Sequence, residues 1–282
     1  MQAVREATND NSVIVIEPSR SRFSLDLSQL WQYRELLYFL IWRDVKVRYK
    51  QTVIGAAWAI LQPLMTMLIF TFVFGKLAKV PSDNLPYPIF AYTALLPWNL
   101  FAGALSRCSG SIVGQSNLIS KVYFPRLIIP LSATISGLVD FAVAFVILLI
   151  MMMWFGISPN WGALALPLFI LLALLTALSV GLWLSAINVK YRDVGYVIPF
   201  LIQLWMFASP VAYPVSMVPQ KWQFLYSLNP MAGVIEGFRW ALLGKGDPAI
   251  GAILISACVV LILLLGGVFF FKRMERYFAD VL

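Results

Sequence analysis

The sequence contains few residues that could carry out chemistry. It has no histidine and two cysteines among 282 residues, so a zinc site would lack its commonest nitrogen ligand and no disulfide framework is expected. The segment LLGKGDP at 242–248 contains a Gly-Lys pair but has neither the spacing nor the hydroxyl of a nucleotide-binding phosphate loop. A Ser-His-Asp set cannot be assembled without a histidine. The sequence therefore predicts no catalytic residues and no metal ligands.

The basic residues form the clearest chemical pattern. Residues 43–50 (RDVKVRYK) carry four positive charges and one negative charge, whereas residues 54–74 carry none. At 1.5 Å per residue, the uncharged run is long enough to cross the hydrocarbon of a bilayer. A positive segment beside such a run is attracted to the anionic headgroups of the cytoplasmic leaflet. We call this segment the basic collar; its cations are Arg43, Lys46, Arg48 and Lys50.

Asp140 is the one acidic residue well inside a predicted membrane span. An ionisable group at that depth is a candidate functional residue. Because it lies in the first half of an unusually long apolar run, it could instead sit near a membrane surface or serve as a buried hydrogen-bonding group. The structural role is favoured, since a proton-driven transporter usually needs more than one such carboxylate.

Membrane-spanning helices must position these residues, because the composition is that of a polytopic membrane protein. Hydrophobic residues make up 61% of the chain and charged residues 12%, with a mean hydropathy of +0.82; soluble domains use roughly twice as many charges. We predict an all-α membrane protein with six transmembrane helices, an N-terminal amphipathic interfacial helix and re-entrant outer-leaflet helices. The six spans are predicted at about 54–74, 89–106, 127–155, 162–187, 194–213 and 249–271.

Two segments outside these spans carry further expectations. Residues 30–50 are predicted to form the interfacial helix, with aromatic residues at headgroup depth. Residues 214–248 contain four prolines and only short helical patterns, so they cannot cross the bilayer as one helix. They are predicted to dip into the outer leaflet, with an ordinary packed extracellular loop as the alternative.

The distribution of basic residues predicts the orientation. Most of the 21 Lys and Arg residues precede residue 54 or lie at 107–126, 190–192 and 272–276. The positive-inside rule then places both termini in the cytoplasm. Residues 1–20 lack the features of a signal peptide, and residues 1–29 are predicted to form a cytoplasmic arm. The net charge of +8 is spread beside apolar spans, which does not indicate a nucleic-acid partner.

Seven segments, in order, carry a resemblance to a known family. They are RDVKVRYKQTVIGAAWAILQP (43–63), YPIFAYTALLPWNLF (87–101), NLISKVYFPRLIIPL (117–131), NVKYRDV (188–194), SPVAYP (209–214), LNPMAGVIEGFRW (228–240) and the terminal RYFADVL. Over residues 30–282 the chain resembles the membrane (permease) subunit of ATP-binding-cassette exporters for cell-surface polysaccharides. KVYFPR and LLPW favour the lipopolysaccharide O-antigen branch. Capsule exporters are similar in outline, and teichoic-acid exporters share much of the pattern.

The resemblance implies a division of labour between subunits. Two copies of this chain would form the transmembrane pathway in the inner membrane, and two separate ATPase subunits would bind ATP and Mg²⁺ on the cytoplasmic side. No cofactor is therefore expected in this chain, and the chain is not expected to be an enzyme. The cargo would be an undecaprenyl-linked polysaccharide. Its diphosphate would be drawn to the basic collar, although these cations could also be membrane anchors only.

The resemblance also implies two sets of contact residues. Residues 110–123 would be the main coupling helix inserted into the ATPase, through Ile112, Val113, Leu118 and Ile119, and the 188–195 loop would add a second contact that includes Arg192. A plain solvated loop is the alternative for the first segment. A group of aromatic residues would stack on sugar rings along the glycan channel: Tyr92, Trp98, Phe101, Trp205, Phe207 and Tyr213.

Two other functional classes remain open at this point. A membrane enzyme acting on lipid-linked sugars would normally show a constellation of loop carboxylates or basic residues, and none stands out. A secondary transporter or passive channel would need no ATPase. Copurification of an ATPase carrying a phosphate loop would separate the exporter from both classes.

Overall fold

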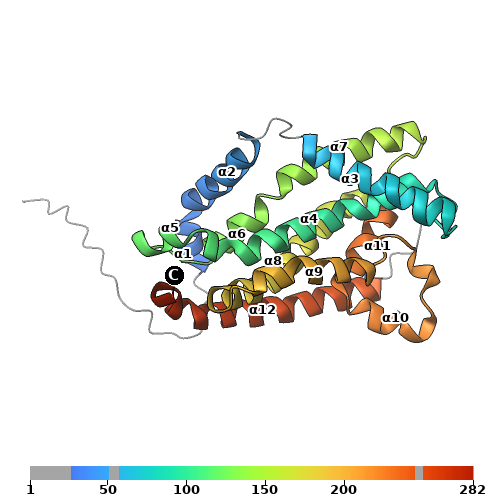
Figure 1. The fold of residues 1–282 in the computed structure, drawn as a ribbon. Coiled ribbons are helices and arrows are strands. Elements are labelled where there is room, and N and C mark those ends of the chain that lie inside the picture. The colour runs from blue at the N-terminus through green and yellow to red at the C-terminus, as the bar shows by residue number, and fades with distance from the viewer. Residues whose placement is uncertain (1–26, 51–56, 245–249, 282) are drawn as a thin grey trace, which may run out of the picture.

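The computed structural model describes residues 27–50, 57–244 and 250–281, and every regular element in these ranges is helical (Figure 1). The predicted cytoplasmic arm lies almost entirely outside the described residues, as does the start of the first predicted span. The elements are α1 (Leu27–Gln32), α2 (Arg34–Lys50), α3 (Ala57–Phe70), η1 (Thr71–Leu77), α4 (Tyr87–Gly114), α5 (Ser116–Lys121), α6 (Ile128–Ile135), α7 (Leu138–Trp154), η2 (Trp161–Ala165), α8 (Leu166–Lys190), α9 (Val194–Phe207), η3 (Val215–Met217), α10 (Gln220–Ser227), α11 (Pro230–Leu243) and α12 (Ile250–Val281).

Long helices run side by side along one axis, so the bundle has two ends (Figure 1). One end gathers α1, α2, α5 and the last turns of α12; the other gathers α10 and α11. We call the first the basic end. Many of the chain's described cations lie on the elements that meet there: Arg34, Arg43, Lys46, Arg48, Lys50, Lys121, Arg126, Lys190, Arg192, Lys272, Arg273 and Arg276.

Five helical stretches among the described residues are long and apolar enough to cross a membrane: 57–77, 87–114, 128–154, 161–190 and 250–278. The prediction of an all-helical, multi-pass membrane protein is therefore confirmed. The fifth predicted span, 194–213, is shorter than expected, because α9 ends at Phe207 after 14 residues. Proline has no N–H to donate and disfavours helical geometry at the preceding residue. Pro210 therefore ends the helix, and residues 208–214 form a turn.

α4 is the central helix of the bundle and is buried along most of its length. It was predicted to stop at residue 106, ahead of a separate helix at 110–123, but it continues unbroken to Gly114. The polar residues that suggested a loop satisfy their hydroxyls within the helix. Ser109 Oγ donates to the Leu105 carbonyl and Ser111 Oγ to the Cys108 carbonyl, both at 2.7 Å. Serine bonded to its own helix in this way does not interrupt it.

The long third span is two helices with a short break. α6 ends at Ile135 and α7 starts at Leu138, so residues 136–137 form a turn inside the apolar run predicted at 127–155. Glycine has low helix propensity and no side chain. Gly137 therefore permits both the break and the close approach of a neighbouring side chain, which is described below.

α12 extends well past the predicted end of the sixth span. The segment expected to be a basic tail after residue 271 remains helical to Val281. Phe271 and Phe278 are both fully buried and their rings meet edge to face at 5.3 Å. They join a second apolar cluster at the basic end, with Leu40, Ile112, Ile119, Phe124, Ile128, Ile129, Leu182, Ala186 and Val189. Packing, rather than membrane hydropathy, keeps these last turns helical.

The N-terminal helix differs from the predicted single amphipathic element. Residues 27–50 form α1 and α2 with a break at Tyr33. The apolar residues of α2 are distributed around the helix instead of forming one stripe, and only Leu40 is buried. Several large aromatic residues are exposed on this element: Trp31, Tyr38, Phe39 and Trp42.

The described part of the segment predicted at 214–248, residues 214–244, contains η3, α10 and α11 at the end opposite the basic end (Figure 1). α11 is buried over most of its length, in contact with α4, α8 and α12. Asn229 caps its start, since Oδ1 accepts from the Met231 N–H at 3.1 Å. Arg239 is 3% exposed; its Nη2 donates to the Val211 carbonyl at 3.1 Å.

Candidate functional site: a cavity with two arginines and one aspartate

A cavity of about 330 Å³ opens where α2, α3, α4 and α7 approach one another. Its polar lining consists of Arg48, Tyr49, Gln62, Asn99, Arg107 and Asp140. Its apolar lining is formed mainly by Trp58, Pro63, Leu96, Leu100, Phe141 and Ala144. The cavity therefore presents charged groups and hydrocarbon side by side, within the range of about 300–1,000 Å³ typical of small-ligand sites.

Asp140 is the centre of the polar cluster. Its carboxylate accepts hydrogen bonds from Arg48 Nη1 and from the Tyr49 hydroxyl. Arg107 Nη1 lies 4.0 Å from the same oxygen, Oδ2, that Arg48 contacts. All three charged side chains are a little under one third exposed. Two guanidinium groups thus converge on one carboxylate oxygen, and the three groups together carry a net charge of +1.

Arg107 reaches the cavity through space left by two glycines. A Cβ on Gly103 would lie 3.0 Å from Arg107 Nη1, and a Cβ on Gly137 would collide with Arg107 Nη2. The guanidinium is also fixed from behind, because Nε donates to the Ala133 carbonyl at 3.2 Å. The break between α6 and α7 therefore leaves space for the Arg107 side chain, which extends from α4 into the cavity.

Tyr49 completes the cluster as a neutral donor. Burial raises the pKa of its phenol to about 12, and the hydrogen bond to the Asp140 carboxylate acts in the same direction. Both effects favour the protonated form. Tyr49 therefore stays protonated at neutral pH and donates a hydrogen bond to the anion that faces it.

The basic collar divides into cavity and surface residues. Arg48 lines the cavity, whereas Arg43, Lys46 and Lys50 are exposed. Arg43 Nη2 pairs with its neighbour Asp44 at 2.8 Å. This split follows from helix geometry, because residues along α2 turn by about 100° each and cannot all face one site.

Two of the residues in the cluster were not singled out in this role by sequence analysis. Asp140 was favoured as structural, and it does hold Arg48 and Tyr49 in place. Arg107 was counted only as a loop cation. The polar Cys and Ser residues around Arg107 suggested a loop, whereas Arg107 lies on the buried helix α4. The available signal was the position of Arg107 directly after residue 106, the predicted end of the second span.

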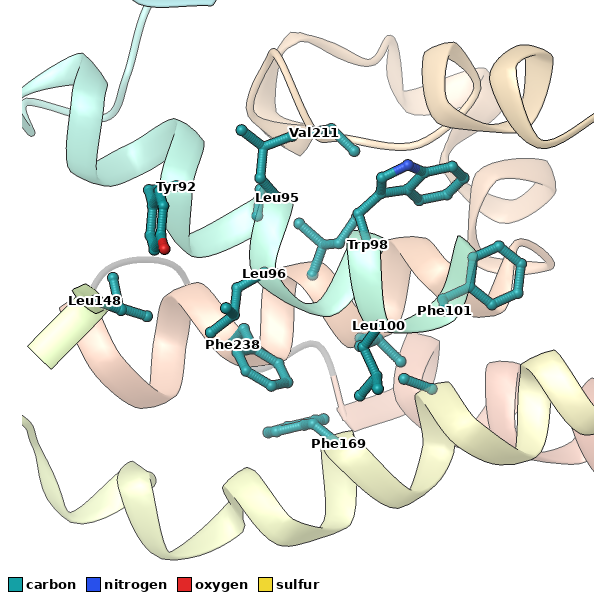
Figure 2. Close-up of a cluster of buried hydrophobic side chains, with 14 of the residues drawn as sticks. Tyr92, Leu95, Leu96, Trp98, Leu100, Phe101, Leu148, Phe169, Val211 and Phe238 are labelled. Carbon is teal, nitrogen blue, oxygen red and sulfur yellow. The ribbon is translucent and has the colours of Figure 1, made fainter. Parts of the chain in front are cut away.

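The aromatic residues expected along the channel fall into two groups. Tyr92, Trp98 and Phe101 are buried in the main core, and Figure 2 shows them packed against neighbours from α7, α11 and the 208–214 turn. Tyr92 Oη donates to the Ala144 carbonyl at 3.1 Å. These three side chains fill the space between helices of this chain. This packing of α4 against distant segments could not be read from the local sequence.

The other three aromatics lie nearer the surface. Trp205 packs edge to face on Phe101 at 4.9 Å and donates to Asn229 Oδ1 at 2.8 Å. Tyr213 donates to the Phe207 carbonyl at 3.0 Å. Phe207 itself is more than half exposed.

The residues expected to contact an ATPase are similarly divided. Ile112 and Ile119 are buried in the second apolar cluster, and Val113 and Leu118 are half-buried against it. The apolar spacing that suggested a docking face thus packs on this chain's own α6, α8 and α12. The exposed surface of the same region is formed by Asn117, Ser120, Lys121, Val122 and Tyr123. Arg192 is exposed in the loop after α8.

Comparison with known proteins places this architecture in a family. The family model for the ABC-2 type transporter matches residues 35–243. The chain is 30% identical over 255 residues to an O-antigen export system permease protein, RfbA, of Myxococcus xanthus, covering 89% of this chain and 97% of that protein. It is 28% identical to an RfbA permease of Klebsiella pneumoniae, covering 88% of this chain and 95% of that protein.

A third relative extends the similarity beyond that group. The polysialic acid transport protein KpsM of Escherichia coli is 26% identical over 206 residues, covering 72% of this chain and 80% of KpsM. The relatives are transport proteins and not enzymes. On the family match and the extent of these similarities, the chain belongs to the ABC-2 type transporter family and is a membrane permease.

Proposed function

We propose that the chain is the transmembrane subunit of an ATP-driven exporter that moves a lipid-linked polysaccharide of the O-antigen type across the cytoplasmic membrane. The observation that carries this proposal is the similarity to O-antigen export permeases over nearly their whole length. The chain would act as a homodimer with two separate ATPase subunits. Undecaprenyl diphosphate would link the glycan to the membrane.

The proposed membrane topology uses the basic end as the cytoplasmic end. Both termini would then be cytoplasmic, in agreement with the positive-inside rule. α9, extended by the 208–214 turn, would act as a sixth span, and η3, α10 and α11 would form a re-entrant outer-leaflet segment. Burial of α11 against α4 and α8 supports this reading, because backbone at membrane depth is tolerated where protein covers it.

The proposed ATPase contact is the exposed rim of the α4–α5 corner. Tyr123 is 79% exposed and Val122 is 53% exposed, and large exposed apolar groups beyond a membrane span suit a protein partner. Arg192 would add a charged contact from the loop after α8. Ile119 of α5 belongs to the second apolar cluster, which also contains residues of α6, α8 and α12. This shared cluster would let force on the rim reach the long helices.

The exposed collar cations are proposed to attract the lipid diphosphate toward the permease. Arg43, Lys46 and Lys50 face outward on α2, where each basic residue near an anionic surface contributes roughly 1 kcal/mol. Trp31 and Trp42 would hold α2 at headgroup depth.

A capsule exporter is the second candidate. The KpsM similarity supports it, at lower identity and over less of the chain than the O-antigen permeases.

Complementation in cells tests the proposal. A strain deleted for this chain should accumulate lipid-linked glycan on the cytoplasmic side, and the wild-type gene should restore surface glycan. Affinity purification of the tagged chain should recover an ATPase subunit. Unchanged surface glycan in the deletion strain, with no lipid-linked intermediate accumulated, would rule out the exporter.

A further inference from the structure

We propose that the cavity between α2, α3, α4 and α7 is the binding site for the diphosphate of an isoprenoid lipid, with Arg48 and Arg107 as its ligands. Asp140 would act as an internal counterion that the diphosphate replaces. The inference rests on the proposed function, because that function supplies a lipid diphosphate as cargo. It adds Arg107, Asp140 and a defined site to it.

The cavity carries a net positive charge. The charged lining residues are two arginines and one aspartate, a net charge of +1. Guanidinium groups suit phosphate oxygens because their fork of N–H donors matches phosphate geometry. A doubly or triply charged diphosphate therefore fits this lining better than a single carboxylate does.

The hydrogen-bond donors of the cavity converge on the Asp140 carboxylate. Arg48 Nη1 contacts Asp140 Oδ2, and Arg107 Nη1 lies 4.0 Å from the same atom. The Tyr49 hydroxyl donates to the other carboxylate oxygen. Three donors from two helices are therefore already directed at one small volume that holds an anion. A diphosphate in that volume would accept from all three.

The apolar part of the cavity lining suits a lipid diphosphate better than a free phosphate. Trp58 and Pro63 of α3 also line the cavity. α3 lies on the outside of the bundle, with Trp58, Leu61 and Met65 exposed. An isoprenoid chain attached to a bound diphosphate could therefore leave the cavity along α3 into the bilayer, while the volume of about 330 Å³ limits the enclosed part to a headgroup.

The position of Asp140 gives the proposal a distinctive consequence. If Asp140 competes with the diphosphate for the arginines, removing its charge should strengthen binding. If it were part of the anion site only as a scaffold, removing its charge would weaken binding by releasing Arg48. Asp140→Asn therefore changes affinity in opposite directions under the two readings.

The test measures binding of radiolabelled farnesyl diphosphate to the purified permease–ATPase complex. The complex is held in phosphatidylcholine nanodiscs with saturating MgADP, so that nucleotide sites do not bind the probe. We expect at least tenfold weaker binding for Arg48→Gln and for Arg107→Gln, and at least threefold tighter binding for Asp140→Asn. Arg34→Gln, at an exposed arginine of α2 outside the basic collar, is the matched control and should stay within twofold of wild type. Thermal unfolding checks that each variant is folded, and Arg107→Lys, which keeps the charge, should lose less affinity than Arg107→Gln.

Competitors identify the chemical source of the anion. Inorganic pyrophosphate and farnesol should each compete at least tenfold more weakly than unlabelled farnesyl diphosphate. Nanodiscs containing phosphatidylglycerol should leave the probe affinity within threefold. Equal competition by pyrophosphate would indicate a soluble-anion site, and strong inhibition by phosphatidylglycerol would indicate an ordinary phospholipid site; either result overturns the proposal.

The outcomes also separate this inference from the proposed function. Wild-type affinity in folded Arg48→Gln and Arg107→Gln, or weakened binding in Asp140→Asn, would overturn the site or its counterion even if the complex exports lipid-linked glycan. A wild-type complex that binds farnesyl diphosphate through these arginines but exports no lipid-linked glycan would instead count against the proposed function.

Discussion

Substitution of Gly237 by alanine tests the packing that holds α11 inside the bundle. Gly237 faces Phe169 of α8, and a Cβ at this position would overlap three atoms of the phenyl ring. Phe169 is buried, and the ring of Phe238 stands next to it at 6.4 Å. The ring therefore has little room to move away from an added methyl group.

The expected cost follows from two opposing effects. Overpacking a well-packed core costs about 1–3 kcal/mol. Alanine is favoured over glycine in a helix interior by about 1 kcal/mol. We expect Gly237→Ala to lower the free energy of unfolding by about 1–2 kcal/mol, since the overlapping atoms belong to a buried ring and not to a flexible chain end.

Unfolding in mixed detergent–SDS micelles, followed by tryptophan fluorescence, measures this change. Gly110→Ala is the matched control, because nothing lies within 4 Å of the Cβ built there; it should be neutral or stabilising. Phe169→Leu should relieve the overlap, so the double variant should show a favourable coupling of about 1 kcal/mol. A Gly237→Ala protein as stable as wild type, with no coupling to position 169, would refute the described packing of α11 on α8.

Three further predictions concern other parts of the chain. Arg239→Gln should lower the free energy of unfolding by about 2 kcal/mol, because it removes a charged donor from a buried carbonyl; thermal melts should show this loss, with no loss in Lys221→Gln. Tyr123→Glu should abolish copurification of the ATPase and leave the amount of permease in the membrane normal. Ile112→Glu should instead lower the amount of permease in the membrane, because Ile112 is buried in this chain's own core. Western blots and pull-downs measure both effects, and the opposite pattern in the two variants would contradict our assignment of the contact surface. Tyr49→Phe should lessen the loss of stability between about pH 10 and pH 12. The native phenol, with its pKa raised to about 12, keeps its proton above the unfolded-state value of 10, so its stabilising contribution is complete below pH 10 and is lost as pH rises toward 12; identical pH profiles for wild type and variant would contradict this.

The extent of the helices could be predicted where hydropathy and local chemistry agreed. The apolar run after the basic collar and the run before Lys190 both appear as long helices. Pro210 also indicated the end of α9, but the span was predicted to continue to residue 213 because apolar residues lie on both sides of this proline. The extension of α4 through Ser109 and Ser111 was not visible, because serine is polar in composition yet bonds to its own helix.

The candidate site could be predicted only in part, because it depends on contacts between distant segments. Arg48 and Asp140 were both noticed, one as a headgroup ligand and one as an intramembrane acid. Their pairing joins residues 92 positions apart, and neither local spacing nor composition indicates it. Arg107 completes the site through the gap at Gly137, a feature of helix packing that a single sequence does not reveal.

The roles of the aromatic residues likewise could not be predicted from the sequence. Aromatic side chains occur at membrane interfaces, in cores and along binding paths, and composition does not separate these roles. Tyr92 and Phe101 belong to the core because α4 is surrounded by other helices. Phe207, on the shorter and more exposed α9, is exposed.

Transport in a reconstituted system tests the central claim most directly. The permease and its ATPase are placed in proteoliposomes with the ATPase facing outward, and a synthetic undecaprenyl-diphosphate-linked glycan is added to the outer leaflet. We expect ATP to make the glycan inaccessible to an external glycosidase, and we expect no protection without ATP or with Arg107→Gln permease. Protection that develops equally without ATP, or a glycan that stays fully accessible with a wild-type complex hydrolysing ATP, would contradict it.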